Sequence, residues 1–244
     1  MGVQSLSELN TEIRKYFEDP GPQIEVRSNS VSGHKFLSVV FDRPIPLSIP
    51  HRATDALQRF KDTFDQTIYG AGLALGAVEP RGNFPWARNP KNLDKRLTDL
   101  KIPDAMHSVI WEQELYWTGE DWSGGNDFIR DLVEMANERH TVNVRAAVKF
   151  DDRDFCLPAL VGNGDCELLH SSSEPIHDPD SNSLILMAWK GDGELVGDFH
   201  APMGIYFDSP KLRSPIEVCA ALRSFRDAAA RFLGDAEVAI RHAG

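Results

Sequence analysis

The sequence predicts an α+β fold, with a helical block packed on a mostly antiparallel β-sheet and an amphipathic helix near the C-terminal end. Three observations support this prediction. Apolar residues recur at helical spacing in the first, middle and last parts of the chain. From residue 142 onward the pattern changes to alternation, which is typical of half-buried strands. Glycine-containing turns separate most of the later strand-like stretches.

The N-terminal region is expected to form a short helix followed by a hairpin. Ser5 and Glu8 have the spacing of a capping box, which favours a helix beginning at Ser5. Prolines and a glycine at 19–22 end that helix. Two strand-like stretches follow at 23–27 and 35–41, and the loop between them has the residues of a hairpin connection. The apolar positions of the helix are Leu6, Leu9, Ile13 and Phe17.

The middle of the chain is predicted to be a helical block. A long helix after Pro50 carries one apolar stripe. Residues 79–125 are irregular, with short helices expected near 93–100 and 104–115, and a further helix over 127–140 capped by Gly125 or Asn126. The aromatics of this connection either line a pocket or pack the connection down. They are Trp111, Tyr116, Trp117 and Trp122.

The later part of the chain predicts strands and a final helix. Strands are expected from 142 and over 155–161, 166–170, 184–189, 194–199 and 203–207, with a polar loop over 171–183. The run Ser214-Pro215-Ile216-Glu217 has the residues of a helix start, with proline at the first helical position. An apolar stripe follows, formed by Ile216, Cys219, Leu222, Phe225, Ala229, Phe232 and Leu233.

The predicted organisation is a single integrated domain spanning residues 1–244. Its helical block covers about 48–140, its sheet about 22–47 and 141–208, and its C-terminal helix about 214–240. The early strands could join the later sheet, which would unite the two parts. Two independent domains are the alternative, because a chain of 244 residues is long enough for either arrangement.

Composition limits the classes of partner. The 26 basic and 37 acidic residues give a net charge of −11, which opposes generic binding to a nucleic-acid backbone, although a local basic patch remains possible. The longest apolar run, 68–78, is too short to span a bilayer, so no membrane partner is expected. Three cysteines without paired spacing indicate reduced thiols in a cytoplasmic protein. No cofactor is predicted.

Few residues suggest chemistry. His140 ends a predicted helix, where a histidine can cap carbonyls, be buried, or act as a base. His170, His177 and Asp178 are possible metal ligands within one predicted loop, but their spacing matches no familiar site and we predict no bound metal. The sequence contains neither a Gly-x-Ser-x-Gly elbow nor a phosphate-binding loop.

Residues 45–145 resemble a widespread set of uncharacterised bacterial proteins. The resemblance lies in the helical stretch 55–65, in the Phe84-Pro85 pair, and in Asn137-Glu138-Arg139-His140, which approximates the family's Asn-x-Lys-His helix end. Lys61 takes the place of an arginine in that family. Gln58 and Gln66 stand where it often has histidine.

The resemblance implies a helical pair similar to HEPN bundles, some of which cleave RNA. It carries Asp55, Asp65, Asn137 and His140 across as candidate site residues. HEPN cleavage uses an Arg-x(4–6)-His motif on a helix, and in this chain that spacing occurs only from Arg27 to His34, within the predicted hairpin. We expect Asp65 and His140 to lie close together, either as a polar tie between helices or as a catalytic dyad.

The leading functional prediction is a non-catalytic binding or interaction module, with a protein as a possible partner. It is motivated by the absence of a specific catalytic motif and by the acidic composition. The alternatives are a HEPN-like ribonuclease and a metal-dependent hydrolase that uses the loop from His170 to Asp180. The sequence leaves open whether the protein is an enzyme.

Overall fold

The computed structural model confirms an α+β fold with antiparallel sheets and a long C-terminal helix. It describes residues 2–137, 145–150, 154–178, 181–209, 212 and 216–243. The chain divides into two compact units, and each is described here by itself. Unit 1 comprises residues 1–9, 50–145 and 207–244; unit 2 comprises residues 10–49 and 146–206.

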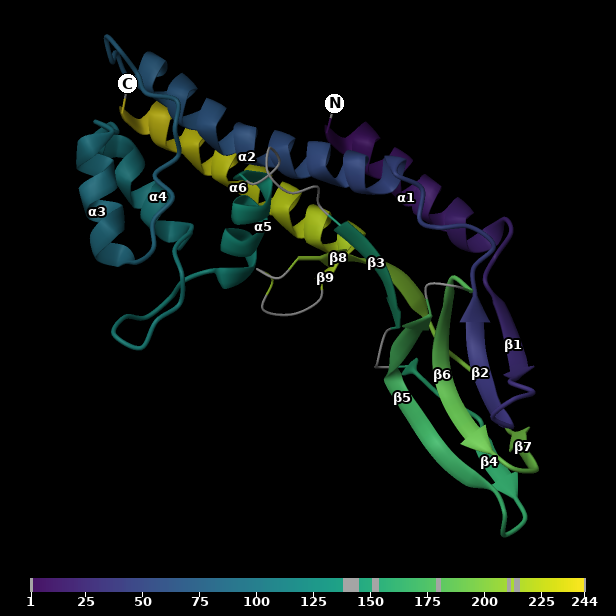
Figure 1. Cartoon of the computed structure of the whole chain (residues 1–244). Helices are drawn as coiled ribbons and strands as arrows, with labels where there is room; N and C mark the ends of the chain where they lie inside the picture. The colour runs from purple at the N-terminus through teal and green to yellow at the C-terminus, as the bar shows by residue number, and fades with distance from the viewer. Residues whose placement is uncertain are drawn as a thin grey trace. The chain divides into compact units, whose positions relative to one another are not determined.

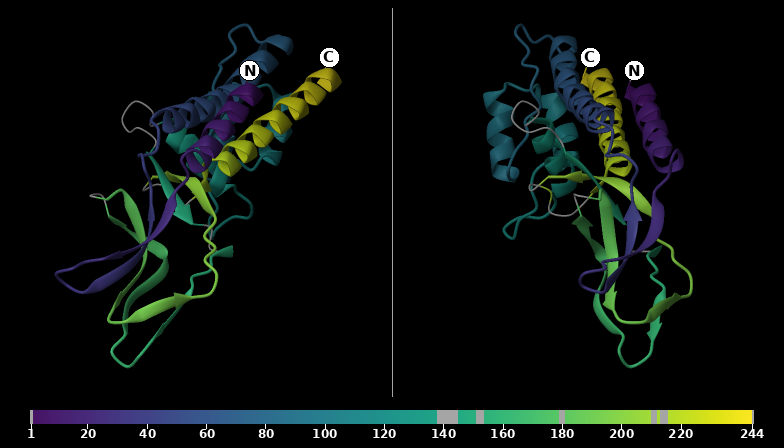
Figure 2. Two further views of the ribbon diagram at one scale, coloured as in Figure 1. Left: turned by 90° about the vertical axis from the view of Figure 1, so that its right-hand side faces the viewer. Right: turned by 45° about the vertical axis from the view of Figure 1, so that its right-hand side comes forward.

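Unit 1 is built mainly from helices (Figure 1). Two long helices, α2 (Ser48–Ala74) and α6 (Val218–Ala243), lie side by side and run in the same direction in all three ribbon views (Figure 2). The start of α1 (Gly2–Glu18) belongs to this unit, where Arg52 pairs with Glu8 at 2.9 Å. The shorter elements are α3 (Pro90–Asp99), the 3₁₀ turn η1 (Asp104–Met106), α4 (His107–Glu112), α5 (Asp127–Asn137) and the short strand β9 (Ile216–Glu217).

An aromatic cluster centred on Phe64 forms the core of unit 1. The predicted stripe of α2 brings Phe64 against α6, with ring centroids 6.0 Å from Phe225 and 5.2 Å from Phe232. The Phe64 ring also meets Phe84 at 5.2 Å and Trp86 at 5.1 Å. Each such pair stabilises the unit beyond the area it buries, by about 1 kcal/mol. The irregular segment before α3 is therefore part of the core.

The last helix begins later than the sequence predicts. The backbone over Ile216–Glu217 is a strand, and α6 starts at Val218. The Glu217 carboxylate caps the helix by accepting hydrogen bonds from the backbone N–H groups of Cys219 and Ala220. The proposed cap at Ser214 and Pro215 lies outside the described residues. Burial, with a contribution from Glu217, raises the pKa of the Cys219 thiol to about 12, in keeping with the core position predicted for it.

Unit 2 contains a four-stranded antiparallel sheet in the order β1-β2-β6-β5. The predicted early hairpin therefore joins a later strand, as the sequence suggested. The strands are β1 (Gln23–Ser28), β2 (His34–Val40), β5 (Glu167–Asp178) and β6 (Ser183–Lys190). A second pairing joins β4 (Ala159–Gly162) to β7 (Gly193–Val196). Strands β3 (Arg145–Phe150) and β8 (Met203–Asp208) lie largely within this unit.

The polar loop predicted over 171–183 is wrong. Strand β5 continues to Asp178 and pairs with β6, with an irregular register between Ser171 and Ile176. Ser171, Glu174 and His177 are exposed on this strand, so the stretch lacks the alternation of apolar and polar residues that marks a half-buried strand. Composition alone therefore misidentified this segment.

The structure divides into two compact units, whereas the sequence predicts a single domain over residues 1–244. Whether the two units form one integrated domain stays a prediction. Among the described helices, none is long and apolar enough to cross a bilayer.

Replacing Phe225 with alanine should lower the free energy of unfolding by about 3–5 kcal/mol, because its ring is fully buried against Phe60 and Phe64. Urea denaturation followed by circular dichroism measures the loss. Leu233→Ala is the matched control on the same helix, since that side chain is 41% exposed. A loss below about 1 kcal/mol for Phe225→Ala would place α6 outside the core.

Candidate functional site

The most unusual side chain of unit 1 is Arg130, on α5. It is only 6% exposed, although arginine is rarely buried without a partner. Its guanidinium lies between two indole rings, 5.7 Å from the centroid of Trp86 and 5.4 Å from that of Trp117. Its Nε and Nη1 atoms are buried, and no acceptor among the residues that the structure describes reaches them. This cluster of Arg130, Trp86 and Trp117 is the candidate site, named the Arg130 site below.

The first wall, Trp86, is positioned by Asp65 on α2. The Asp65 carboxylate accepts a hydrogen bond of 2.8 Å from the backbone N–H of Phe84. The N–H of Trp86 then donates to the carbonyl of Phe84 at 2.8 Å, closing a tight turn around Pro85. Trp86 is thereby placed against Phe64, at 5.1 Å, and near the guanidinium of Arg130.

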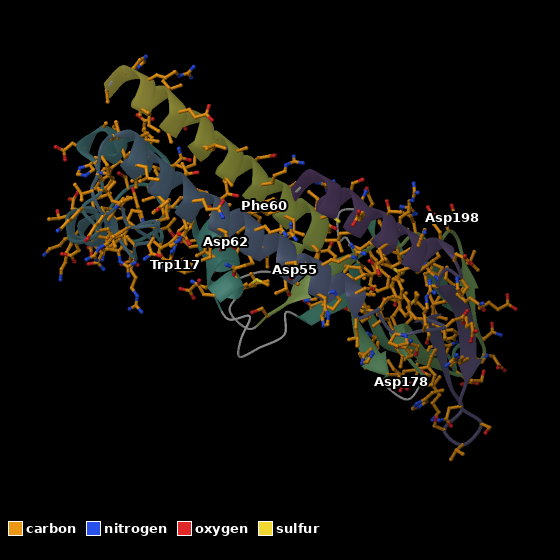
Figure 3. The ribbon with its side chains drawn as sticks, turned by 90° about the horizontal axis from the view of Figure 1, so that it is seen from above. Asp55, Phe60, Asp62, Trp117, Asp178 and Asp198 are labelled. Atoms are coloured by element: carbon orange, nitrogen blue, oxygen red, sulfur yellow. The ribbon has the colours of Figure 1, made fainter. Side chains whose placement is uncertain are left out.

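The second wall, Trp117, is positioned by the start of α5. Asp127 accepts hydrogen bonds from the backbone N–H and the hydroxyl of Thr118, at 2.7 and 2.6 Å. Asn126 caps the helix by accepting from the N–H of Ile129 at 3.0 Å, which confirms one of the two predicted caps. Figure 3 labels Trp117 on the connection before α5.

The connection that carries Trp117 requires glycine at position 125. Its φ of +111° lies in a region that other residues rarely adopt. A Cβ atom there would also come within 2.8 Å of the Thr118 backbone nitrogen. The close approach of the two ends of the connection therefore depends on this glycine.

The positive charge of Arg130 is only partly compensated by neighbouring carboxylates. Burial lowers the pKa of Arg130 from its ordinary value, and the charges of Arg96 and Arg88 lower it further. Glu134 and Asp131 act in the opposite direction. The nearest atoms of Arg130 and Glu134 are 3.8 Å apart, which is an ion pair but too long for a hydrogen bond. The guanidinium thus lacks the fork-to-fork contact that usually accompanies a buried arginine.

The candidate site residues implied by the resemblance differ in their location and contacts. Asp65 is held by Phe84 and by Lys61, whose Nζ lies 2.9 Å from its second carboxylate oxygen. Asn137 is the last residue of α5 and is exposed. His140 lies outside the described residues, so its expected proximity to Asp65 stays a prediction.

The possible metal ligands are spread along β5. His170 and His177 pair with Ala188 and Leu184 of β6, so four residues of that strand separate their positions. That spacing corresponds to about 13 Å, too far for two ligands of one ion. Asp178 accepts a hydrogen bond of 2.5 Å from the Ser181 hydroxyl. Within the part of the chain that the structure describes, no three histidine, cysteine or acidic residues are grouped to hold a metal ion.

The sequence reasoning missed Arg130 and Trp86. It singled out Trp117 only as part of an aromatic cluster with two possible roles. The residue pattern carried no direct signal, because the burial of nearly every side chain after Phe128 is evident only in the structure. A charged residue in such a stretch requires a partner.

Comparison of the chain with protein-family models, with curated proteins and with solved structures found no match. The argument for function therefore depends on the geometry of the Arg130 site.

Asp65→Ala should lower the free energy of unfolding by about 1–3 kcal/mol, because the half-buried Lys61 and the N–H of Phe84 lose their acceptor. It should also change the tryptophan emission, since Trp86 loses its anchor. The control is Asp62→Ala on the same helix, where the carboxylate accepts from Gln58 one turn away and the cost should be about 0.5 kcal/mol. Equal losses for the two variants would contradict the positioning role.

Proposed function

We propose that the protein is a non-catalytic binding module whose ligand supplies a hydrogen-bond acceptor to Arg130. The observation that carries this proposal is the buried guanidinium with two donor atoms that have no acceptor. Buried polar groups in folded proteins are almost always hydrogen-bonded, so an exception calls for an explanation. A missing ligand provides one.

The energetic terms favour this explanation over a purely structural one. Each indole face can stabilise a desolvated cation by about 2 kcal/mol. Two unmet donors on a charged group cost about 1–3 kcal/mol each or more, and desolvation of the charge adds to this. The indoles therefore offset only part of the cost, whereas an incoming oxyanion would pair the charge and accept a hydrogen bond from one of the unmet donors.

The candidate catalytic residues that the structure describes support an enzyme less well than Arg130 supports a binding module. Both Asp65 oxygens already accept a contact, from Phe84 and from Lys61. These contacts give Asp65 a structural role, in positioning the turn at Phe84, that requires no catalysis. The HEPN-like ribonuclease stays a prediction, because its histidine lies outside the described residues. No observation favours the metal-dependent hydrolase.

Replacing Arg130 with methionine tests whether the arginine is kept for binding. Methionine fills a similar volume without a charge, so the ligand-free variant should be more stable than the wild type by about 1–2 kcal/mol. Urea denaturation measures the difference. Arg226→Met is the control: Arg226 pairs with its exposed neighbour Asp227, and this change should stay within about 0.5 kcal/mol.

A structural role for Arg130 predicts the opposite sign. If the two indoles and the ion pair with Glu134 made the arginine a net stabiliser, Arg130→Met would destabilise the protein by more than about 1 kcal/mol. That result would remove the basis of the proposed function.

A further inference from the structure

We infer that the edge of strand β1 (Gln23–Ser28) pairs with the same strand of a second copy of this chain, so that two four-stranded sheets join into one antiparallel sheet. Three features of β1 point to this pairing: the backbone groups that it presents, its exposed apolar side chains, and the order of its charges. The Arg130 site plays no part in it, so the proposed function and this pairing stand or fall separately.

Strand β1 presents backbone groups that can bind a further strand. It lies at one end of the order β1-β2-β6-β5, outside β2 in Figure 1. The N–H of Asn29 donates to the carbonyl of His34 across the hairpin at 2.8 Å. Because bonded and non-bonded pairs alternate along an antiparallel ladder, the N–H and C=O groups of Ile24, Val26 and Ser28 point away from β2. Such a row of groups is a template for strand pairing.

The two edges of this sheet differ in how well they are protected. Strand β5 shifts its register against β6 twice, and such irregularities interrupt the edge at which a new strand would pair. Strand β1 pairs with β2 along its whole length without a shift. It contains neither proline nor lysine, two residues that commonly block an edge. The more open edge is therefore β1.

The exposed apolar side chains of β1 lie on one face of the sheet. Ile24 is 54% exposed and Val26 is 56% exposed. They lie opposite Val39 and Leu37 of β2, which are buried, and directly opposite residues in an antiparallel pair share a face. The apolar face of the sheet thus continues to its edge, where a further strand would cover Val26.

The order of charges on β1 indicates that this further strand is a second copy. Glu25 and Arg27 lie on the other face, with their side chains 2.8 Å apart. If two β1 strands run antiparallel with Val26 opposite Val26, each Glu25 lies opposite an Arg27, and the outward backbone groups of the two copies face each other. A shift of two residues in either direction places Glu25 opposite Glu25 or Arg27 opposite Arg27, which is unfavourable. The strand is thus complementary to itself in one register.

The size of the contact predicts a transient dimer. A contact limited to one edge of six residues is smaller than a standard stable interface of about 1,200–2,000 Å². We therefore expect a dissociation constant of roughly 10–100 μM, with monomer and dimer in rapid exchange.

Sedimentation velocity of the whole protein, at concentrations that bracket this constant, tests the pairing. The wild type should shift reversibly from monomer to dimer. Glu25→Arg and Arg27→Glu should each weaken dimerisation by roughly 10-fold, because each places like charges opposite one another twice across the two-fold axis. An equimolar mixture of the two variants should form a heterodimer at least as readily as the wild type dimerises, since opposite charges again face each other.

Two further variants complete the test. Val26→Pro should abolish dimerisation, because it removes an outward N–H that β2 does not use, and proline is tolerated in an edge strand at such a position. Circular dichroism checks that this variant folds. The matched control is the pair Arg226→Glu and Asp227→Arg, which makes the same changes of charge at an ion pair on α6, in unit 1. Neither control variant should change the dissociation constant.

Three results would contradict the inference. A wild type that stays monomeric throughout the concentration range has no such pairing. A dimer that Glu25→Arg, Arg27→Glu and Val26→Pro all leave unchanged forms through another surface. A dimer that is lost on Val26→Pro, but whose charge variants neither weaken it nor recover when mixed, pairs in a register other than the one centred on Val26.

Discussion

The arrangement of unit 1 depends on one hydrogen bond, from the backbone N–H of Phe84 to the carboxylate of Asp65. It fixes an irregular segment onto helix α2, nineteen residues earlier in the chain. Once Phe84 is fixed, its ring packs against Phe64 and Phe232, and the turn around Pro85 delivers Trp86 to the guanidinium of Arg130. Because an irregular segment has no helix or sheet hydrogen bonds of its own, a charged acceptor on a neighbouring helix is a strong way to hold it.

The same device occurs on the other side of the site. Asp127 receives the N–H and hydroxyl of Thr118 and so holds the connection that carries Trp117. Carboxylates are thus used to position the walls, while the guanidinium between the walls has only a long contact with Glu134. A structural role for Arg130 would be served better by a carboxylate in direct contact, since a buried cation requires both charge compensation and hydrogen bonds.

Local patterns in the sequence predicted the elements but not the site. The stripe through Leu222, Phe225 and Phe232 predicted α6 because helical spacing is a property of neighbouring residues. The edge strand β5 was missed because its polar side chains face solvent, and a solvated strand resembles a loop in composition. The Arg130 site combines residues from positions 86, 117 and 130, which come together through tertiary contacts that no periodicity encodes.

The structure also gives a physical reason for two of the features that carried the resemblance. Asp65 and the Phe84-Pro85 pair lie far apart in the sequence, yet they meet through a hydrogen bond of 2.8 Å. A fold that needs the aspartate to anchor this turn would retain both features whether or not it cleaves RNA. For Asp65 to serve as the partner of a catalytic His140, it would have to share or release a contact that holds Phe84 or Lys61. Because each carboxylate oxygen has two lone pairs, sharing would leave Phe84, Trp86 and the Arg130 site in place, whereas release of Phe84 would loosen them.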